Sequence, residues 1–530
     1  MTARRAVAII GTGPTGIYSL KHLLGAGLPL DVTLYERGPR AGIGMPYSPQ
    51  TANKSMLANI ASIEIPPVVS TYLEWLEAQP PARLASYGLD PEDLDDRQFT
   101  PRLLLGEYFR DQLLDLVEDA RAAGHRIAIH ENTEVLDIGT GEEGLTATTL
   151  AVRDGPFDRV IVATGHQFPD VDEATRTYFP SPWSGLIEAA IPAVRVGIMG
   201  TSLSSIDAAM AVVNQHGRFR SRNGTLRFDL DPASSDLEVV LMSRTGVLPE
   251  ADFYCPIPYE PLTFVTGPAL AACLKTSKPL DAAFDLIKDE ITQADPAFAL
   301  RLGLKSLTAD SFPNAYFASR ETSDPFEWAR RNLQEVEYNK AHKITVAWRY
   351  ALLRIHEEVE DIVADLPEAD RERFDSGLKK VFVDNYAAVP SESIRRLLAL
   401  RDAGILSLLT LGEDYELDRE ESVTRITRRD GQVDTFEVFI DARGQKALTS
   451  EDLPFPSLRR TLLENGQEIP DVSQDYSLIE AGSYTGRLCL AALPYLMHDR
   501  PFVQGITACA DIAEAIAAGL TTRRRRRLVS

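Results

Sequence analysis

The chain has little cysteine and no long apolar run. Its four cysteines, spread over 530 residues, lack the spacing of metal ligands and are too few for a disulfide framework. No apolar run approaches the roughly 18 residues of a membrane-spanning helix, and the basic start, MTARR, leads into a strand pattern instead of a cleavable signal. We expect buried thiols, no metal site, no membrane segment and a cytoplasmic protein.

Positive charge is also scarce. There are 55 lysines and arginines against 77 acidic residues, a net charge of −22. This balance argues against a general nucleic-acid-binding role, because contacts to phosphates need clustered cations. The run Arg523–Arg527 is the exception: it could contact a membrane, an acidic partner or a nucleic acid, or be a solvated tail.

The first nucleotide-binding pattern is AVAIIGTGPTGIYSLKHLL, residues 6–24, in which a buried-strand pattern meets a helical one. At such a turn Gly11 permits a tight bend and Gly13 lets a pyrophosphate approach the backbone. Gly16 allows the helix and the strand to pack closely, and the helix N-terminus faces the pyrophosphate anion. The next strand pattern ends in Glu36, where a carboxylate can accept hydrogen bonds from both ribose hydroxyls of an adenosine. These features predict bound FAD.

A second pattern of strand, glycine turn and helix, VRVGIMGTSLSSIDAAMAVV, covers 194–213 without the usual third glycine. It follows DRVIVATGHQFPD at 158–170, in which Val160–Ala163 predicts a strand and Thr164-Gly165 its exit. The strand after the second turn ends in Ser243 and Arg244 instead of an acid. A cation there accommodates a ribose 2′-phosphate, so we predict NADPH. An exposed strand-end arginine is the alternative.

From about residue 263 the apolar spacing becomes helical, and the stretch KKVFVDNYAAV at 379–389 predicts a strand that resumes the α/β pattern. A hairpin turn is expected at Asp430–Gly431. It is followed by DARG at 441–444, a strand exit that resembles the ATG exit at 163–165. We therefore predict an α/β fold of two dinucleotide-binding, Rossmann-like domains with a helical insertion. The expected parts are an FAD-binding domain (1–192 and 446–520), an NAD(P)H-binding domain (193–262 and 379–445), the insertion (263–378) and an arginine-rich tail (521–530).

Together these motifs resemble the two-dinucleotide-binding flavoproteins, and more narrowly a bacterial FAD/NAD(P)-binding family related to the flavin-dependent N-hydroxylating monooxygenases. The narrower resemblance rests on GPRAGIGMPYS at 38–48, SMLANIAS at 55–62, TYLEWLEAQ at 71–79 and FTPRLLLGEYFRDQL at 99–113. In the last, the family's pattern is met by Phe99, Pro101, Arg102, Gly106 and Tyr108.

Characterised relatives include enzymes that oxidise the amino group of aspartate to nitrosuccinate. The resemblance thus implies a monooxygenase that uses FAD, NADPH and oxygen to oxygenate the amino group of a small amino acid, aspartate favoured, through a flavin hydroperoxide. A reductase or dehydrogenase without oxygen insertion and a non-catalytic flavin-binding partner protein are the alternatives. No nucleic-acid or membrane partner is expected.

The candidate site residues follow from these motifs. Those for FAD are Gly11, Gly13, Pro14, Thr15, Gly16, Glu36, Arg37, Gly44, Met45, Asn59, Arg102, Thr164, Gly165, Gln504 and Gly505. Gln504 and Gly505 are included because a final helix that begins there would aim its N-terminus at the flavin. Those for NADPH are Gly200, Thr201, Ser202, Leu203, Ser204 and Arg244.

Two residues are candidates for chemistry and three for substrate binding. Asn59 is a candidate flavin neighbour because the family places an asparagine there, with a loop cap as the alternative. His166 could contact nicotinamide or substrate, or be a structural loop histidine. An acidic substrate needs cations, and the insertion supplies Lys340, Lys343 and Arg349. Arg349 is preferred because guanidinium groups bind carboxylates bidentately; a solvated helix face is the alternative.

Overall fold

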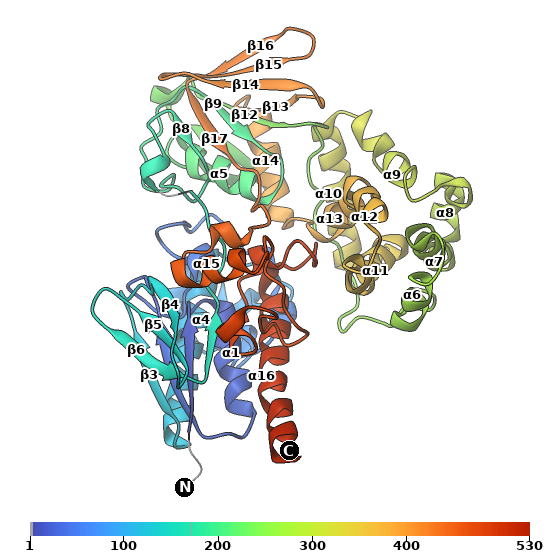
Figure 1. Ribbon diagram of the computed structural model, residues 1–530. Helices are drawn as coiled ribbons and strands as arrows, with labels where there is room; N and C mark the ends of the chain where they lie inside the picture. Colours follow the sequence, from blue (N-terminus) through green and yellow to red (C-terminus); the bar gives the residue numbers. More distant parts are fainter. Residues whose placement is uncertain (1–3, 170, 530) are drawn as a thin grey trace. The chain divides into compact units, whose positions relative to one another are not determined.

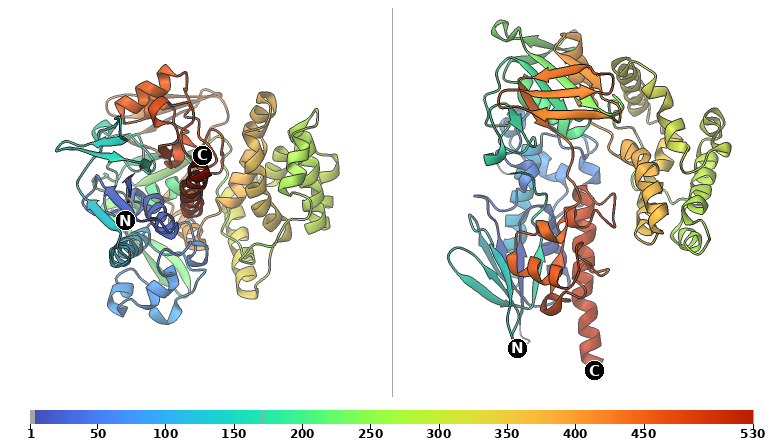
Figure 2. Two further views of the ribbon diagram at one scale, coloured as in Figure 1. Left: turned by 60° about the horizontal axis from the view of Figure 1, so that its bottom comes forward. Right: turned by 45° about the horizontal axis from the view of Figure 1, so that its top comes forward.

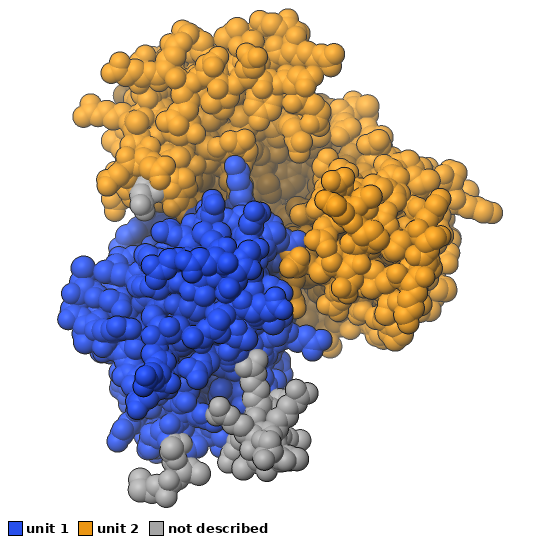
Figure 3. All heavy atoms as spheres, in the orientation of Figure 1, with its two compact units in different colours: residues 1–167, 445–498, 503–530 blue, residues 168–444, 499–502 orange. Residues whose placement is uncertain are grey.

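The computed structural model describes residues 4–169 and 171–529, with side chains as far as residue 520. The chain divides into two compact units, which Figure 3 colours separately. Unit 1 comprises residues 1–167, 445–498 and 503–530, and unit 2 comprises residues 168–444 and 499–502.

Unit 1 is built on a five-stranded parallel sheet of order β18-β7-β1-β2-β3. Its central strand is apolar on both faces, and Val7, Ala8 and Ile9 are fully buried, as expected for a strand that is covered on both sides. The strands are β1 (Arg5–Ile10), β2 (Leu30–Tyr35), β3 (Arg126–His130), β7 (Arg159–Val162) and β18 (Leu488–Leu490), with a small antiparallel sheet of β4 (Asp137–Thr140), β5 (Leu145–Thr148) and β6 (Arg153–Phe157).

Two helices of unit 1 from opposite ends of the chain lie side by side, α1 and α16 (Figure 1). Thr15 Oγ1 donates a hydrogen bond to Cys509 Sγ at 3.0 Å, which links them directly. Burial raises the pKa of Cys509 to about 11, so this thiol stays protonated and unreactive. The helices of unit 1 are α1 (Pro14–Gly25), α2 (Tyr72–Glu77), α3 (Pro81–Ala85), α4 (Arg102–Ala122), α15 (Pro456–Glu464) and α16 (Gly505–Val529).

Unit 2 repeats this arrangement. Its parallel sheet has the order β8-β17-β9-β12-β13, and a three-stranded antiparallel sheet is again inserted before the fourth strand of the repeat. The strands are β8 (Tyr178–Phe179), β9 (Arg195–Met199), β12 (Glu238–Ser243), β13 (Leu406–Thr410) and β17 (Val438–Asp441), with β14 (Tyr415–Arg419), β15 (Thr424–Arg428) and β16 (Val433–Phe436) in the small sheet. The hairpin expected at Asp430–Gly431 joins β15 to β16.

The rest of unit 2 comprises α5 (Leu203–Val213), the hairpin β10 (Gly217–Arg222) and β11 (Thr225–Leu230), α14 (Ser391–Asp402) and a helical module. The module, green to gold in Figure 2, consists of helices around a core that includes Phe284, Ile355 and Phe374. Its helices are α6 (Gly267–Cys273), α7 (Pro279–Ala294), α8 (Pro296–Leu302), α9 (Phe312–Glu321), α10 (Pro325–His342), α11 (Ala347–Val363), α12 (Glu368–Ser376) and α13 (Leu378–Tyr386).

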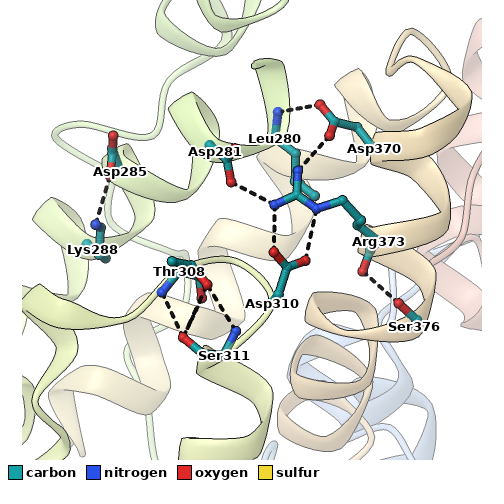
Figure 4. Close-up of polar contacts among 10 residues, drawn as sticks. All are labelled: Leu280, Asp281, Asp285, Lys288, Thr308, Asp310, Ser311, Asp370, Arg373 and Ser376. Carbon is teal, nitrogen blue, oxygen red and sulfur yellow. Dashed lines mark hydrogen bonds and ion pairs between the residues drawn. The ribbon is translucent and has the colours of Figure 1, made fainter.

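One arginine ties together several segments of the module (Figure 4). Arg373 of α12 pairs with Asp370 on its own helix, with Asp281 of α7 and with Asp310 in the loop before α9, all within 2.9 Å. Asp370 also accepts a hydrogen bond from the Leu280 amide at 3.1 Å. One guanidinium therefore fixes α7, α12 and the α9 loop relative to one another.

The structure differs from two expectations. The strand predicted at 379–389 is wrong, because most of this stretch lies in α13, where Leu378, Val381, Phe382 and Asn385 are buried at helical spacing. Residues 168–192, expected in the first domain, belong to unit 2, where β8 pairs with β17. All four cysteines are buried free thiols, as predicted. In the described part of the chain, no helix has the length and apolarity to cross a membrane.

Candidate cofactor-binding site

The first glycine turn lies between β1 and α1, and its glycines have different roles. Gly11 has φ +95°, and a Cβ there would lie 2.3 Å from the Ala163 carbonyl oxygen; one on Gly16 would lie 2.2 Å from the Gly11 oxygen. The fold itself requires these two glycines. Gly13 has φ −68°, and a Cβ would meet only the Gly44 Cα, at 3.2 Å. Gly13 thus keeps the turn open beside the N-terminus of α1.

Glu36 directly follows β2 and is held in place from two sides. Its Oε2 accepts a hydrogen bond from Thr12 Oγ1 at 2.6 Å, and its Oε1 accepts one from the Gly38 amide at 2.8 Å. Thr12 Oγ1 in turn accepts from the Gly42 amide at 3.0 Å. The carboxylate is therefore oriented at the carboxyl end of the sheet, where open α/β folds bind nucleotides.

A cavity of about 490 Å³ in unit 1 brings these features together. This volume is typical of a small-molecule site. Pro14 and Gly505, the first residues of α1 and α16, both line it, so two helix N-termini border it, an arrangement that favours anionic groups. The sequence-predicted residues that line it are Gly11, Gly13, Pro14, Thr15, Glu36, Arg37, Gly44, Met45, Thr164, Gly165, His166 and Gly505.

Two residues at the exit of β7 complete the wall of this cavity. The hydroxyl of Thr164 is buried and has no hydrogen-bond partner among the described residues, so it is available to a ligand. Burial lowers the pKa of His166, and this effect outweighs a hydrogen bond with Gln445 that would raise the pKa. The imidazole is therefore neutral at pH 7. An open phosphate turn, an oriented carboxylate and an unsatisfied hydroxyl fit FAD.

Some predicted residues lie outside this wall, and other residues were missed. Among the described residues, the lining does not include Gly16, Asn59, Arg102 or Gln504. Asn59 Oδ1 is buried without a hydrogen-bond partner in the described part of the chain, and Arg102 Nε donates to the Leu57 oxygen at 3.0 Å. Sequence reasoning missed Thr133–Val135, Pro454 and Phe455, which line the cavity but belong to no recognisable motif.

The second glycine turn lies in unit 2 between β9 and α5. Gly200 has φ +123°, and a Cβ there would lie 2.4 Å from Ser205 Oγ, so the position requires glycine. Thr201 Oγ1 donates to the Val247 oxygen at 2.8 Å. Ser202 is the N-cap of α5, although its side chain makes no capping bond, and Leu203 and Ser204 begin the helix.

The ends of the strands beside this turn correspond to those in unit 1. The Gly11 amide donates to the Tyr35 oxygen, and the Gly200 amide donates to the Met242 oxygen. Ser243 therefore corresponds to Glu36, and Arg244 follows it. The Arg244 side chain is exposed, and its Nη1 lies 3.2 Å from Glu413 Oε2.

The three candidate substrate cations have separate surroundings in unit 2. Arg349 is 4% exposed and pairs through Nη1 with Glu250 Oε2 at 3.1 Å, so it does not lie on a solvated face. Lys340 pairs with Asp252 at 2.8 Å, and Lys343 is the exposed C-cap of α10. The side chains of Arg523–Arg527 lie outside the described residues, and their role stays a prediction.

Comparison with known proteins identifies the class of the fold. Residues 8–167 match the model of the FAD-NAD(P)-binding family, which confirms FAD and a nicotinamide nucleotide as the cofactors. The fold is that of the L-lysine 6-monooxygenase of Pseudomonas syringae (13% identity, 99% of both chains, TM-score 0.51). It is also that of the cadaverine monooxygenase DfoA of Erwinia amylovora (12% identity, 98% of this chain and 95% of that one, TM-score 0.52). The predicted two-dinucleotide flavoprotein fold is confirmed.

Sequence comparison places the chain within that class. Residues 268–386, most of the helical module, match the YdhS-like middle domain. The chain is 54% identical over 531 residues to the uncharacterized protein YdhS of Escherichia coli K12, covering 99% of each, and it belongs to the YdhS family. It also matches the flavin-containing monooxygenase ustF1 of Aspergillus flavus, at 29% identity over 181 residues, 32% of this chain and 38% of that protein.

Proposed function

We propose that the protein is an FAD-dependent monooxygenase that uses NADPH to oxygenate the amino group of a small amino acid. The observation that carries this proposal is the repeated sheet with different side chains at equivalent strand ends, Glu36 in unit 1 and Ser243 followed by Arg244 in unit 2. A carboxylate suits an unphosphorylated ribose, and an arginine suits a 2′-phosphate. One chain with both sites is equipped to pass reducing equivalents from NADPH to FAD.

The names of similar proteins support the oxygenase over the alternatives. The two structures of the same fold are, by their titles, a lysine and a cadaverine monooxygenase, and the fungal relative is a flavin-containing monooxygenase. In this proposal FAD, when bound, takes a hydride from NADPH and activates oxygen. Every other task falls to the side chains and backbone of the cavity.

Those tasks are binding, orientation and proton transfer. The turn at Gly13 and the N-terminus of α1 hold the pyrophosphate, and the Glu36 carboxylate accepts hydrogen bonds from the ribose hydroxyls. An amine must be neutral to attack an electrophile, so the substrate ammonium has to lose a proton first. His166 is a neutral imidazole in the cavity wall, which can accept that proton.

Aspartate is the finer part of the proposal. Its second carboxylate would need a cation, and Arg349 is the candidate. Because Glu250 already neutralises Arg349, the guanidinium would have to hold the substrate and Glu250 together or exchange one for the other.

The test is coupled turnover. FAD-loaded protein is supplied with NADPH and each amino acid in turn, while oxygen uptake, NADPH oxidation and peroxide are recorded and products are analysed by mass after reaction in ¹⁸O₂. We expect one amino acid to stimulate oxygen uptake and NADPH oxidation together, with little release of peroxide, and to gain labelled oxygen on nitrogen. NADPH oxidation that needs another acceptor would favour a reductase, and no oxidation with any acceptor would favour a non-catalytic flavin-binding protein.

A further inference from the structure

Unit 2 contains a second cavity, of about 230 Å³, between the helices of the module. We call it the module cavity. Its walls come from α8, α9, α10, the start of α11 and the segment between β12 and α6. The proposed function involves this cavity only through Glu250, the partner of Arg349.

The walls of the module cavity are aromatic. Phe298 and Trp348 stack with ring centroids 4.3 Å apart and planes at 5°, and Tyr316 meets Trp348 edge-on at 6.0 Å. Trp328 also lines the cavity, and its Nε1 donates to Glu250 at 2.9 Å, which orients the indole. Trp328 and Trp348 are both half-buried residues. Such surfaces suit a flat ring.

Buried charge borders the same cavity. Arg320 is 6% exposed; its Nη1 donates to Asp384 and its Nη2 to the Leu248 oxygen. Its Nε has no hydrogen-bond partner among the described residues, and the Glu250 carboxylate lies 4.0 Å from it. Buried N–H groups are normally hydrogen-bonded. The arginine therefore has binding capacity that the neighbouring protein groups leave unused.

The charges sum to one positive unit. Arg301 and Arg320 line the cavity against the single carboxylate of Glu250. Asp384, paired with Arg320, and Arg349, paired with Glu250, add one charge of each sign. A ligand with one negative charge would neutralise the site, and a cation there would add to the excess.

We propose that the module cavity binds a small planar aromatic monocarboxylate. The ring packs against the indoles of Trp328 and Trp348, and the carboxylate pairs with the guanidinium groups of Arg301 and Arg320. This site is independent of the chemistry proposed for FAD, and it stands whether or not the protein oxygenates an amine.

Calorimetric titration of the FAD-loaded full chain with 2-naphthoate, without NADPH, tests the site. We expect one naphthoate per chain, with the neutral 2-naphthamide and the non-aromatic cyclohexanecarboxylate each binding at least tenfold more weakly. No heat at millimolar naphthoate would mean that the cavity holds only water. Equal affinity for acid and amide would equally overturn the proposal.

Variants locate the binding. Ala315→Leu and Ser319→Leu, two changes on α9 that fill the cavity, should each weaken naphthoate binding at least tenfold. Ala318→Leu, exposed on the same helix, should leave it unchanged. Arg301→Gln removes an exposed charge without disturbing the core and should narrow the difference in affinity between naphthoate and naphthamide. FAD content and melting temperature report folding; naphthoate binding that both filling variants retain would place the site elsewhere.

Discussion

Ser243 occupies in the second sheet the place that Glu36 occupies in the first. In each sheet the glycine after the first strand donates its amide to the last carbonyl oxygen before this position, Tyr35 or Met242. The two turns thus have different side chains at the equivalent strand end. In the proposed function these side chains face the two riboses and set the choice of coenzyme.

The first prediction concerns the coenzyme. If Arg244 binds the 2′-phosphate, Arg244→Ala should raise the KM for NADPH and leave that for NADH nearly unchanged. A charged hydrogen bond of this kind contributes about 1.5–3 kcal/mol, which corresponds to a tenfold to hundredfold change. Arg429→Ala, which removes another exposed arginine of unit 2, is the control. An equal rise in KM for both coenzymes would show that Arg244 has a structural role instead.

The second prediction separates binding from folding at the first turn. Gly13→Ala should leave the fold intact, because its φ suits any residue, but lower FAD affinity about tenfold to a hundredfold by blocking the pyrophosphate. Gly16→Ala should destabilise unit 1, since the added Cβ clashes with the Gly11 oxygen. Gly25→Ala, at the other end of α1 with open space around it, is the matched control. Flavin release on heating and circular dichroism measure the two effects.

The third prediction concerns the ribose contact. Glu36→Gln should lower FAD affinity about tenfold, because a charged acceptor becomes a neutral amide. Glu134→Gln makes the same chemical change at another residue that lines the same cavity but does not follow β2, and it should change affinity less. Fluorescence titration of each apoprotein variant with FAD gives its dissociation constant. The ribose assignment fails if the two variants bind FAD alike.

Local patterns allowed the nucleotide turns to be predicted, because each lies within about 30 residues of sequence. Gly11 and Gly200 have the positive φ of the turns that their spacing predicts, and Glu36 directly follows β2, while its ribose contact stays a prediction. The wrong strand at 379–389 has a physical explanation: Val381, Phe382 and Val383 are strand-forming residues, and the helical spacing of Leu378, Val381, Phe382 and Asn385 is only two turns long.

Long-range pairs could not be predicted from any local pattern. Arg349 and Glu250 are 99 residues apart, and Thr15 and Cys509 are 494 apart. Only the folded chain brings them together. For the same reason Phe455 lines the cavity of unit 1 without any sequence signal.

The fourth prediction concerns the aspartates around Arg373. Hydrogen bonds from Arg373 lower the pKa of Asp310. A group with a lowered folded pKa stabilises the fold above its unfolded pKa, about 4, and loses that contribution as pH falls through the folded pKa. Arg373→Met should therefore reduce the stability of the module by about 1 kcal/mol at pH 7, and the deficit should shrink below pH 4. Lys379→Met, which breaks one exposed helix pair, is the control in urea unfolding. A deficit that is independent of pH would assign the effect to packing.

The last prediction asks whether Arg349 is structural or binds substrate. Burial alone would raise the pKa of Glu250, but the charges of Arg349 and Arg320 outweigh it and hold the pKa below its usual value. Arg349→Met leaves Glu250 buried with weaker compensation, which should cost about 3–5 kcal/mol. The folded pKa then rises, and a group with a raised folded pKa loses its stabilising contribution as pH increases through it. The deficit in urea unfolding should consequently grow from pH 5 to pH 8.

The double variant Arg349→Met, Glu250→Gln distinguishes the two roles, because it removes both charges and should recover most of the stability. If Arg349 also binds a substrate carboxylate, the restored protein should retain FAD and be reduced by NADPH normally. It should, however, lose tenfold or more in affinity for aspartate and release peroxide instead of product. Normal aspartate turnover by the double variant would show that Arg349 serves only to neutralise Glu250. The aspartate preference would then be wrong, and the broader proposal of an amine-oxygenating flavoprotein would rest on the two nucleotide sites alone.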